Sequence, residues 1–370
     1  MPFIIFWLKP YTVFHGFNSI IPVTEFVPDT LHLNWDDEVS LALDSIKRSY
    51  KGKRYMFPKP PYNKVSVNGL KDSSKLRFKG DYLRHLNREE WSFRLKNKKS
   101  NKWRGNKKIN FHHPAERLDI NEYVFQKYMI ESGHLALDYD FSLVVKNGLE
   151  PQLYAYEECI DRNYLTKRKL KGEILRFDEG EFFNWIMFHT PDSFPTSLID
   201  KFYISSKILP VGKVNDQILF AEAKRKLLEW RLGKIKTSEI FNVEKTADFL
   251  ALSDIWGAQH GIGFNNIKLF FDADLHKFEL IATDGNSSLL GKLLIDQKYK
   301  LFQTFFANEE FKNIYLEKID RYKHGRRISM FLLENLSSIK SRVKLLEHYY
   351  PNSDNNLAYL HYNFKVAQND

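Results

Sequence analysis

Cysteine is nearly absent from this sequence, since Cys159 is the only one among 370 residues. A single cysteine excludes an intrachain disulfide and a zinc site built from several cysteines. Its neighbours Glu157 and Glu158 disfavour a reactive thiolate, because adjacent carboxylates raise the pKa of a thiol. We therefore interpret Cys159 as structural. The compartment stays open, because a secreted protein need not carry disulfides.

Long apolar runs and glycine-rich loops are also missing. The apolar stretch at residues 1–8 ends at Lys9 and Pro10, so it is too short to span a membrane. It also lacks the basic region and the small-residue cleavage site of a secretory signal. We expect no membrane span, and either a cytoplasmic protein or one whose start lies upstream. No Walker-type glycine spacing occurs, so any phosphate site must differ from a P-loop.

Acidic residues are fewer than basic ones, 46 against 56, which gives a formal net charge of +10. Such a chain attracts anions, including nucleotides, acidic proteins and nucleic acids. Residues 94–108 hold eight Lys and Arg and no acidic residue. A run of this kind is usually a solvated loop. Nucleic acid is a disfavoured partner, because only Trp103 is available in the run for base stacking.

Aromatic residues, by contrast, are plentiful at 15% of the chain, and hydrophobic residues make up 43%. This composition predicts a sizeable core, and the length suffices for one two-lobed domain or two ordinary ones. Seven of the thirteen prolines fall in residues 1–62. Their density favours an irregular N-terminal extension with one short helix near residues 36–51.

Alternating apolar and polar residues follow, and then helical periodicity. Pro114 opens a predicted helix that runs to about Glu131, with an apolar stripe of Ile120, Val124 and Tyr128. Strands are expected at 64–70, 76–79, 92–96, 108–111, 141–149, 152–158, 266–272 and 277–282. Helices are expected at 219–233, at 243–256 and within 288–350. A strand-rich half before a mostly helical half predicts an α+β chain.

Two blocks in the first half resemble the CotH kinase-like family. The first is FKGDYLRHLNREEWSFRLK, residues 78–96, which is similar to a strand ending in glycine and a polar residue, followed by a strand of the type S-[FY]-[KR]-[IL]-K. The second is FSLVVKNGLEPQLYAYEECID, residues 141–161. There an apolar strand and Asn-Gly precede a strand in which Leu153, Tyr154, Glu158 and Asp161 fit the family's pattern.

The third block, residues 247–284, is the longest. It resembles the family's helix, loop, Asn, strand, hairpin, strand and Asp, and it carries a D-[LI]-x-G-x-x-H-G pattern. The matching residues are Asp254, Gly257, His260, Gly261, Asn266 and the final Asp284. The resemblance covers residues 64–286 and does not extend to 1–62 or 290–370.

The resemblance implies an α+β, bilobed protein-kinase-like fold. We expect a β-rich N-lobe at 63–190 and a mainly helical C-lobe at 191–350 that carries the metal-site hairpin. An irregular extension, 1–62, would precede them, and a C-terminal tail, 351–370, would follow. Two features depart from the family. Glu90 and Trp91 stand where a Lys pair is common, and no Asp lies five residues before Asn266, where Gly261 is found.

The candidate metal ligands are Asn266 and Asp284, because Mg²⁺ or Mn²⁺ takes oxygen ligands and phosphoryl transfer requires charge neutralisation. Antiparallel pairing of the hairpin would bring these two side chains roughly within 8 Å. Both residues are also ordinary turn residues, which is the alternative. His260 is a candidate base or phosphate ligand at a helix end, or else a capping residue. Asp254 is the nearest upstream carboxylate and a second catalytic candidate.

Lys96 and Arg94 are candidates for the cation on the phosphates of ATP, since they share a strand face; the alternative is an exposed basic face. Glu158 matches the family's Glu near the connection between lobes and could bind a ribose hydroxyl or a cation. The implied function is an ATP-dependent kinase with Mg or Mn, acting on a hydroxyl acceptor such as protein Ser or Thr. The alternative is a degenerate kinase-like scaffold with a surface or coat partner. The resemblance would also allow an extracellular or cell-surface location if the true N-terminus lies upstream of this sequence.

Overall fold

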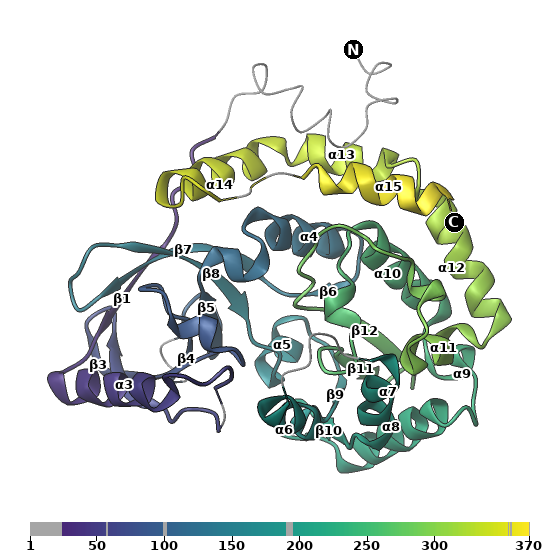
Figure 1. Ribbon diagram of the computed structural model, residues 1–370, viewed down its shortest axis with the longest axis horizontal. Helices are drawn as coiled ribbons and strands as arrows, with labels where there is room; N and C mark the ends of the chain where they lie inside the picture. Colours follow the sequence, from purple (N-terminus) through teal and green to yellow (C-terminus); the bar gives the residue numbers. More distant parts are fainter. Residues whose placement is uncertain are drawn as a thin grey trace.

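The computed structural model describes residues 24–56, 58–98, 102–189, 195–353, 355 and 357–369. They form a mixed α+β structure with two sheets, a closed barrel and a five-stranded sheet, and many helices (Figure 1). The expected α+β class is therefore confirmed. None of the described helices is long and apolar enough to cross a membrane.

Seven strands close the barrel, in the order β1-β2-β3-β4-β5-β8-β7. They are β1 (Thr30–Asn34), β2 (Asn63–Val67), β3 (Leu70–Phe78), β4 (Phe93–Asn97), β5 (Lys108–His112), β7 (Tyr139–Lys146) and β8 (Gln152–Glu158). Alternate residues such as Phe78, Phe93 and Phe111 are fully buried inside the barrel. Side chains between them, such as Arg77 and Arg94, therefore lie on its outer wall.

The described part of the expected N-terminal extension contributes to the barrel. Helix α3 (Asp37–Tyr50) begins after Asp36, whose side chain accepts a hydrogen bond from Val39 N, so the short predicted helix is confirmed. Strand β1 pairs with β2 and runs parallel to β7, which closes the barrel. The alternation in TLHLN, which buries Leu31 and Leu33, is the signal for β1. Residues 1–23 lie outside the described part of the chain.

The second sheet has the order β10-β9-β11-β12-β6. Its strands are β6 (Leu135–Ala136), β9 (Gly172–Phe177), β10 (Ile208–Pro210), β11 (Leu269–Asp272) and β12 (Phe278–Ala282). Strands β11 and β12 form the expected antiparallel hairpin, with Leu269 opposite Leu280. The hairpin therefore lies in a larger sheet, and β9 pairs with its other edge.

Helices surround this second sheet and cross the top of the molecule (Figure 1). They are α4 (Ile120–Glu131), α5 (Arg162–Lys167), α6 (Gly180–Phe188), α7 (Thr196–Ser205), α8 (Gln217–Arg231), α9 (Thr237–Ile240), α10 (Val243–Ile255), α11 (Lys300–Phe306), α12 (Glu309–Tyr322), α13 (Arg326–Glu334), α14 (Leu336–Tyr349) and α15 (Tyr359–Asn369). Short 3-10 helices are η1 (Leu83–Leu86), η2 (Pro114–Arg117), η3 (Gln259–Ile262) and η4 (Leu294–Asp296).

Two sequence expectations about helices need correction. The helix expected at 114–131 is divided into η2 and α4, because Leu118 and Asp119 have φ values of 56° and 55° and cannot continue a right-handed helix. The expected stripe of α4 is nevertheless buried. The expected tail at 351–370 contains α15, which packs Leu360 and Phe364 into the core.

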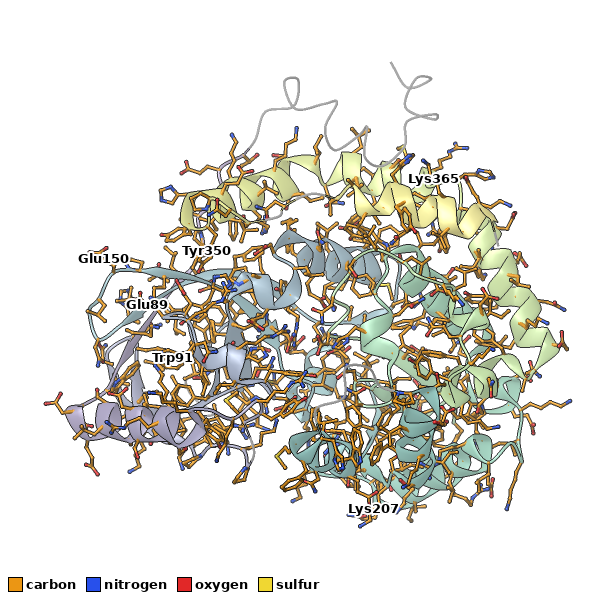
Figure 2. The ribbon with its side chains drawn as sticks, viewed as in Figure 1. Glu89, Trp91, Glu150, Lys207, Tyr350 and Lys365 are labelled. Atoms are coloured by element: carbon orange, nitrogen blue, oxygen red, sulfur yellow. The ribbon has the colours of Figure 1, made fainter. Side chains whose placement is uncertain are left out.

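The barrel and the helical part have separate hydrophobic cores. One core fills the barrel, and a larger one joins the second sheet to α4, α8 and α10–α15. Trp91, labelled in Figure 2, belongs to the barrel core, is 6% exposed and contacts Phe78 and Phe93 edge to face. The position where the CotH-like pattern commonly has lysine is therefore occupied here by a core residue.

Candidate functional site

A cavity of about 670 Å³ lies between the outer wall of the barrel and the second sheet. The residues that line it include nine cations and five carboxylates, so positive charge is in excess. The cations are Lys59, Arg77, Lys79, Arg84, Arg94, Lys108, Arg117, Arg176 and Lys268. The carboxylates are Asp81, Glu157, Glu158, Glu179 and Asp284. A concave surface with this charge attracts anions.

Lys79 enters the cavity directly after β3. Its Nζ lies 3.3 Å from Oε1 of Glu157 in β8. Burial lowers the pKa of Lys79, and Glu157 opposes that shift. Burial alone would raise the pKa of Glu157, but Lys79 and Arg117 lower it well below the usual range. Glu157 is therefore ionised at neutral pH and fixes the Lys79 ammonium in place.

The chain turns sharply at Gly80, which keeps Lys79 at the cavity. Gly80 has a φ of 118°, in a region that favours glycine. A Cβ atom there would lie only 2.2 Å from the ring of His85. That ring is buried and contacts Ser92 Oγ at 3.0 Å. Only glycine therefore fits between Lys79 and the following turn.

Arg117 connects this pair to the second sheet. Its Nε lies 3.7 Å from Glu157 Oε2, and its Nη1 lies 3.1 Å from Asp284 Oδ1. Burial opposes the charge on Arg117, but Asp284 and Glu157 more than compensate and raise its pKa. Lys79, Glu157, Arg117 and Asp284 therefore form one chain of alternating charges along the cavity wall. Removing one member would leave a buried charge without its partner.

Asp284 lies in a turn after β12 whose backbone conformation is unusual. Asp284 and Asn286 have φ values of 52° and 49°. Glu122 of α4 holds this turn, because its carboxylate accepts hydrogen bonds from Gly285 N at 3.2 Å and from Asn286 N at 2.9 Å. Glu122 is 1% exposed, and Gln126 Nε2 donates to it at 2.7 Å. Burial raises the pKa of Glu122 to about 7.

Only one carboxylate oxygen of Asp284 contacts the protein among the described residues. Its Oδ1 lies 3.1 Å from Arg117 Nη1, 3.2 Å from Asn286 Nδ2 and 3.7 Å from His260 Nε2. No hydrogen bond to its Oδ2 is found among the described residues, and the side chain is 22% exposed. Asp284 therefore combines an anchored oxygen with a free one, which suits a carboxylate that binds a cation.

His260 lies between Asp284 and Asn266. Asn266 Nδ2 donates to the carbonyl of His260 at 3.0 Å and lies 3.0 Å from its Nε2. That nitrogen therefore accepts the hydrogen bond, and the imidazole is neutral. Partial burial lowers the pKa of His260; Asp284 opposes this shift and Arg117 adds to it. Asn266 Nδ2 lies 3.0 Å and Asp284 Oδ1 lies 3.7 Å from the same atom, His260 Nε2. The separation between Asn266 Nδ2 and Asp284 Oδ1 therefore cannot exceed the sum of these two distances.

Close backbone packing brings this loop to the hairpin. A Cβ atom on Gly261 would lie 2.2 Å from the carbonyl oxygen of Thr283. Any larger residue would therefore push the loop that carries His260 away from Asp284. Gly261 occupies the position where a kinase-like pattern would place its catalytic Asp, and steric reasons explain why no side chain is found there.

Five of the seven residues expected from the sequence line the cavity: Arg94, Glu158, His260, Asn266 and Asp284. Glu158 is 1% exposed and forms ion pairs with Arg168 at 2.7 Å and Lys167 at 3.1 Å. Its carboxylate is therefore already neutralised, in the segment that links the barrel to α5. It supports this connection and has little capacity left to bind a further cation.

Asp254 does not reach the cavity, which corrects its assignment as a catalytic candidate. It is completely buried in α10, where it accepts hydrogen bonds from Gln259, Tyr315 and Leu294 N. Burial raises its pKa to about 7, although these hydrogen bonds act in the opposite direction. Asp254 instead ties the loop after α10 to α12, and so supports the loop that carries His260.

Lys96 is also displaced from the cavity, because it is exposed and lies one alternate position beyond Arg94 along β4. Sequence reasoning missed Lys79, Arg117 and Glu157. Lys79 was included in a block that resembles the CotH-like pattern, and its alternation with Phe78 placed it on the polar face of β3. The missing information was that this outer face lines a cavity together with residues next to the second sheet, such as Lys268 and Asp284.

A divalent cation would need ligands from outside the protein at this site. The described residues contain no group of three or more His, Cys, Asp and Glu that could hold a metal ion. Asp284 Oδ2 and the Asn266 amide provide two oxygens, and the remaining ligands would be water and phosphate oxygens. This arrangement fits Mg²⁺, which keeps several waters and takes few ligands from protein.

Comparison of the chain with protein-family models gives no match, and comparison with curated proteins gives no similar sequence. The assignment of a function therefore depends on the site itself and on the sequence blocks described above.

Proposed function

We propose that this chain is a CotH-like atypical kinase that transfers the terminal phosphoryl group of ATP, with Mg²⁺ or Mn²⁺, to a hydroxyl acceptor such as protein Ser or Thr. The observation that carries the proposal is the chain of charges Lys79–Glu157–Arg117–Asp284 in one cavity. Kinases combine a lysine on the phosphates, held by a glutamate, with an aspartate that binds the metal.

The cations on the outer wall of β3 and β4 would bind the phosphates. Arg77 and Arg94 lie directly opposite each other across the two strands. Two like charges in that position destabilise a sheet unless an anion lies between them. Arg77 lines the cavity, and its Nε has no hydrogen-bond partner among the described residues, so its guanidinium group would have a donor to offer a phosphate oxygen. Together with Lys79 these groups would neutralise a triphosphate.

Asp284 and Asn266 would hold the metal ion. When bound, the ion would neutralise charge on the phosphate oxygens and orient the terminal phosphoryl group. His260 would accept the proton from the acceptor hydroxyl at Nε2, where the hydroxyl would replace the amide of Asn266 as hydrogen-bond donor. A neutral imidazole with a pKa below its ordinary value is available as a base at neutral pH. The acceptor oxygen forms a bond to the terminal phosphorus, the bond from that phosphorus to the bridging oxygen breaks, and ADP leaves.

Apolar side chains in the cavity lining support a base-binding site. Leu137, Ile160, Val211, Phe182 and Phe183 line it, next to the segment that links β8 to α5. A nucleotide lying along the cavity would place its base there and its phosphates at Lys79. The β-rich barrel, the connecting segment and the helical part would then correspond to the two lobes and the hinge of a kinase.

A second candidate function is a nucleotide-binding scaffold without transfer. It is favoured by Gly261, which leaves the usual position of the catalytic carboxylate without a side chain. The two candidates differ in one experiment, in which the chain is incubated with γ-labelled ATP and Mg²⁺ or Mn²⁺ and with acceptor peptides that contain serine. Labelled peptide from the natural sequence but not from Asp284→Asn supports the kinase. Binding of ATP without label transfer supports the scaffold, and absence of both contradicts the proposal.

A further inference from the structure

Four lysines stand in register across four neighbouring strands of the barrel. Lys64 of β2 lies opposite Lys75 of β3, Lys75 lies opposite Lys96 of β4, and Lys96 lies opposite Lys108 of β5. We call these four residues the lysine ladder. Facing residues of neighbouring strands share one face of a sheet. Leu95, next to Lys96, is buried inside the barrel, so the ladder lies on the outer wall.

The ladder is largely free of compensating charge. Lys64, Lys75 and Lys96 are exposed and form no ion pair with any described residue, while Lys108 lies 3.4 Å from Asp161. Like charges directly opposite each other destabilise a sheet. Four lysines in one row therefore repel one another, and an anionic partner would relieve this repulsion. Lys108 also lines the cavity, so one end of the ladder opens into the candidate site.

We propose that the lysine ladder binds an acidic segment of the acceptor protein and guides it to the cavity. Neighbouring strands lie about 4.8 Å apart, so the ladder extends over roughly 14 Å, the length of four or five residues of extended chain. An acidic run of this length would pair with the ladder and place a neighbouring hydroxyl near Lys108. The partner's role as acceptor rests on the proposed kinase function, whereas binding of the acidic segment does not require it.

The surroundings of the ladder favour an acidic protein segment over nucleic acid. Binding of single strands depends on exposed aromatic rings that stack on bases. Trp103 is buried against Phe111 and Tyr156. Tyr62 is 37% exposed, but one face of its ring already lies against the guanidinium group of Arg77. Lysines act as flexible point charges without the planar fork of arginine. They suit carboxylates along a peptide that has no fixed geometry.

The test uses fluorescence anisotropy with a labelled peptide that carries a short run of glutamates followed by one serine. The variant Lys75→Gln/Lys96→Gln removes two ladder charges outside the cavity. The matched control Lys224→Gln/Lys344→Gln removes two exposed lysines from α8 and α14. At low salt the ladder variant should bind the peptide about fivefold more weakly or worse, and the control should bind it as the natural sequence does.

Three outcomes would overturn the proposal: no peptide binding by the natural sequence, equal weakening in both variants, or tighter ladder-dependent binding of a single-stranded oligodeoxynucleotide of the same net charge. A parallel thermal-shift titration with ATP and metal separates the two proposals. Stabilisation by nucleotide without peptide binding rejects only the proposal that the lysine ladder binds an acidic segment, and it leaves the kinase proposal standing. Ladder-dependent peptide binding without any effect of nucleotide rejects the kinase function and leaves the ladder as a surface for acidic proteins.

Discussion

Arg117 Nη1 lies 3.1 Å from Oδ1 of Asp284, and this ion pair joins the 3-10 helix after β5 of the barrel to the turn after β12 of the second sheet. Because Arg117 also faces Glu157, the position of Asp284 is coupled through these charges to that of Lys79, which also lines the cavity. In the proposed function, the cation for the phosphates and the carboxylate for the metal would thus be linked by charges within the protein.

Replacing Asp284 by asparagine should weaken metal-dependent binding of ATP by more than about tenfold, because the carboxylate acts by charge on the metal. Asparagine tolerates the positive φ of this position, so the fold should be retained. Asp274→Asn, in the exposed turn of the same hairpin, should leave binding unchanged. Isothermal titration with ATP and Mg²⁺ measures both. A structural role alone predicts a loss of stability of about 1 kcal/mol with unchanged affinity.

Lys79→Met should reduce ATP affinity strongly, whereas Lys96→Met should not. Methionine keeps the length of the lysine side chain and removes its charge, and Lys79 lines the cavity while Lys96 is exposed outside it. Glu157 loses its partner in Lys79→Met, so a fall in melting temperature is also expected. Equal affinities of the two variants for ATP would show that Lys79 does not bind phosphates.

His260→Gln should lower the rate of transfer and leave ATP affinity nearly unchanged. A base must be deprotonated, and the pKa of His260 lies below its ordinary value of 6.5. The rate of the natural sequence should therefore rise with pH below 6.5 and level off above it. The variant should lack this rise. A pH profile of single-turnover rates at saturating ATP makes the comparison, and identical profiles would exclude His260 as the base.

Glu122→Gln should change how stability depends on pH. Burial raises the pKa of Glu122 from 4.5 to about 7 in the folded state, so the folded protein binds this proton more tightly than the unfolded chain. The resulting stability is complete below pH 4.5 and is lost as pH rises through 7. Relative to the natural sequence, Glu122→Gln should gain on the order of 3 kcal/mol between pH 4.5 and 8. Urea unfolding of both proteins across this pH range measures how their difference in free energy of unfolding changes with pH. A difference that is the same at every pH would contradict the prediction.

The same variant should weaken metal binding, because an amide cannot accept hydrogen bonds from both Gly285 N and Asn286 N. Asp284 would then lose the turn that presents its free oxygen. Titration with Mn²⁺ in the presence of ATP measures this effect. Gln126→Ala is a useful companion variant, since it removes the hydrogen bond to Glu122 but leaves the carboxylate.

Local periodicity predicted most elements of this fold. The stripe of α4, helix α10 and the β11–β12 hairpin were all evident from residue spacing. Closure of the barrel was not, because β1 pairs in parallel with β7 across more than a hundred residues and such pairing leaves no local signal. The break at Leu118 was likewise invisible, since leucine rarely adopts a positive φ and a single aspartate such as Asp119 is not by itself a signal for one.

The candidate site was predicted in part for the same reason. Asn266 and Asp284 were found because a hairpin brings its two ends together. Lys79 and Arg117 were not, because their importance arises from a cavity that the outer wall of the barrel shares with residues next to the second sheet. Asp254 was selected because it matches a position in the CotH-like sequence pattern. Its complete burial in α10 could not be predicted from residue spacing alone.

The most direct test of this account is a thermal-shift titration with ATP alone, with Mg²⁺ or Mn²⁺ alone and with both together. A ligand that binds only the native state must raise the melting temperature. We predict a rise that requires nucleotide and metal together and that disappears in Lys79→Met and in Asp284→Asn. Melting temperatures that do not respond to nucleotide and metal, or a rise that both variants retain, would contradict the assignment of this cavity as a site of phosphoryl transfer.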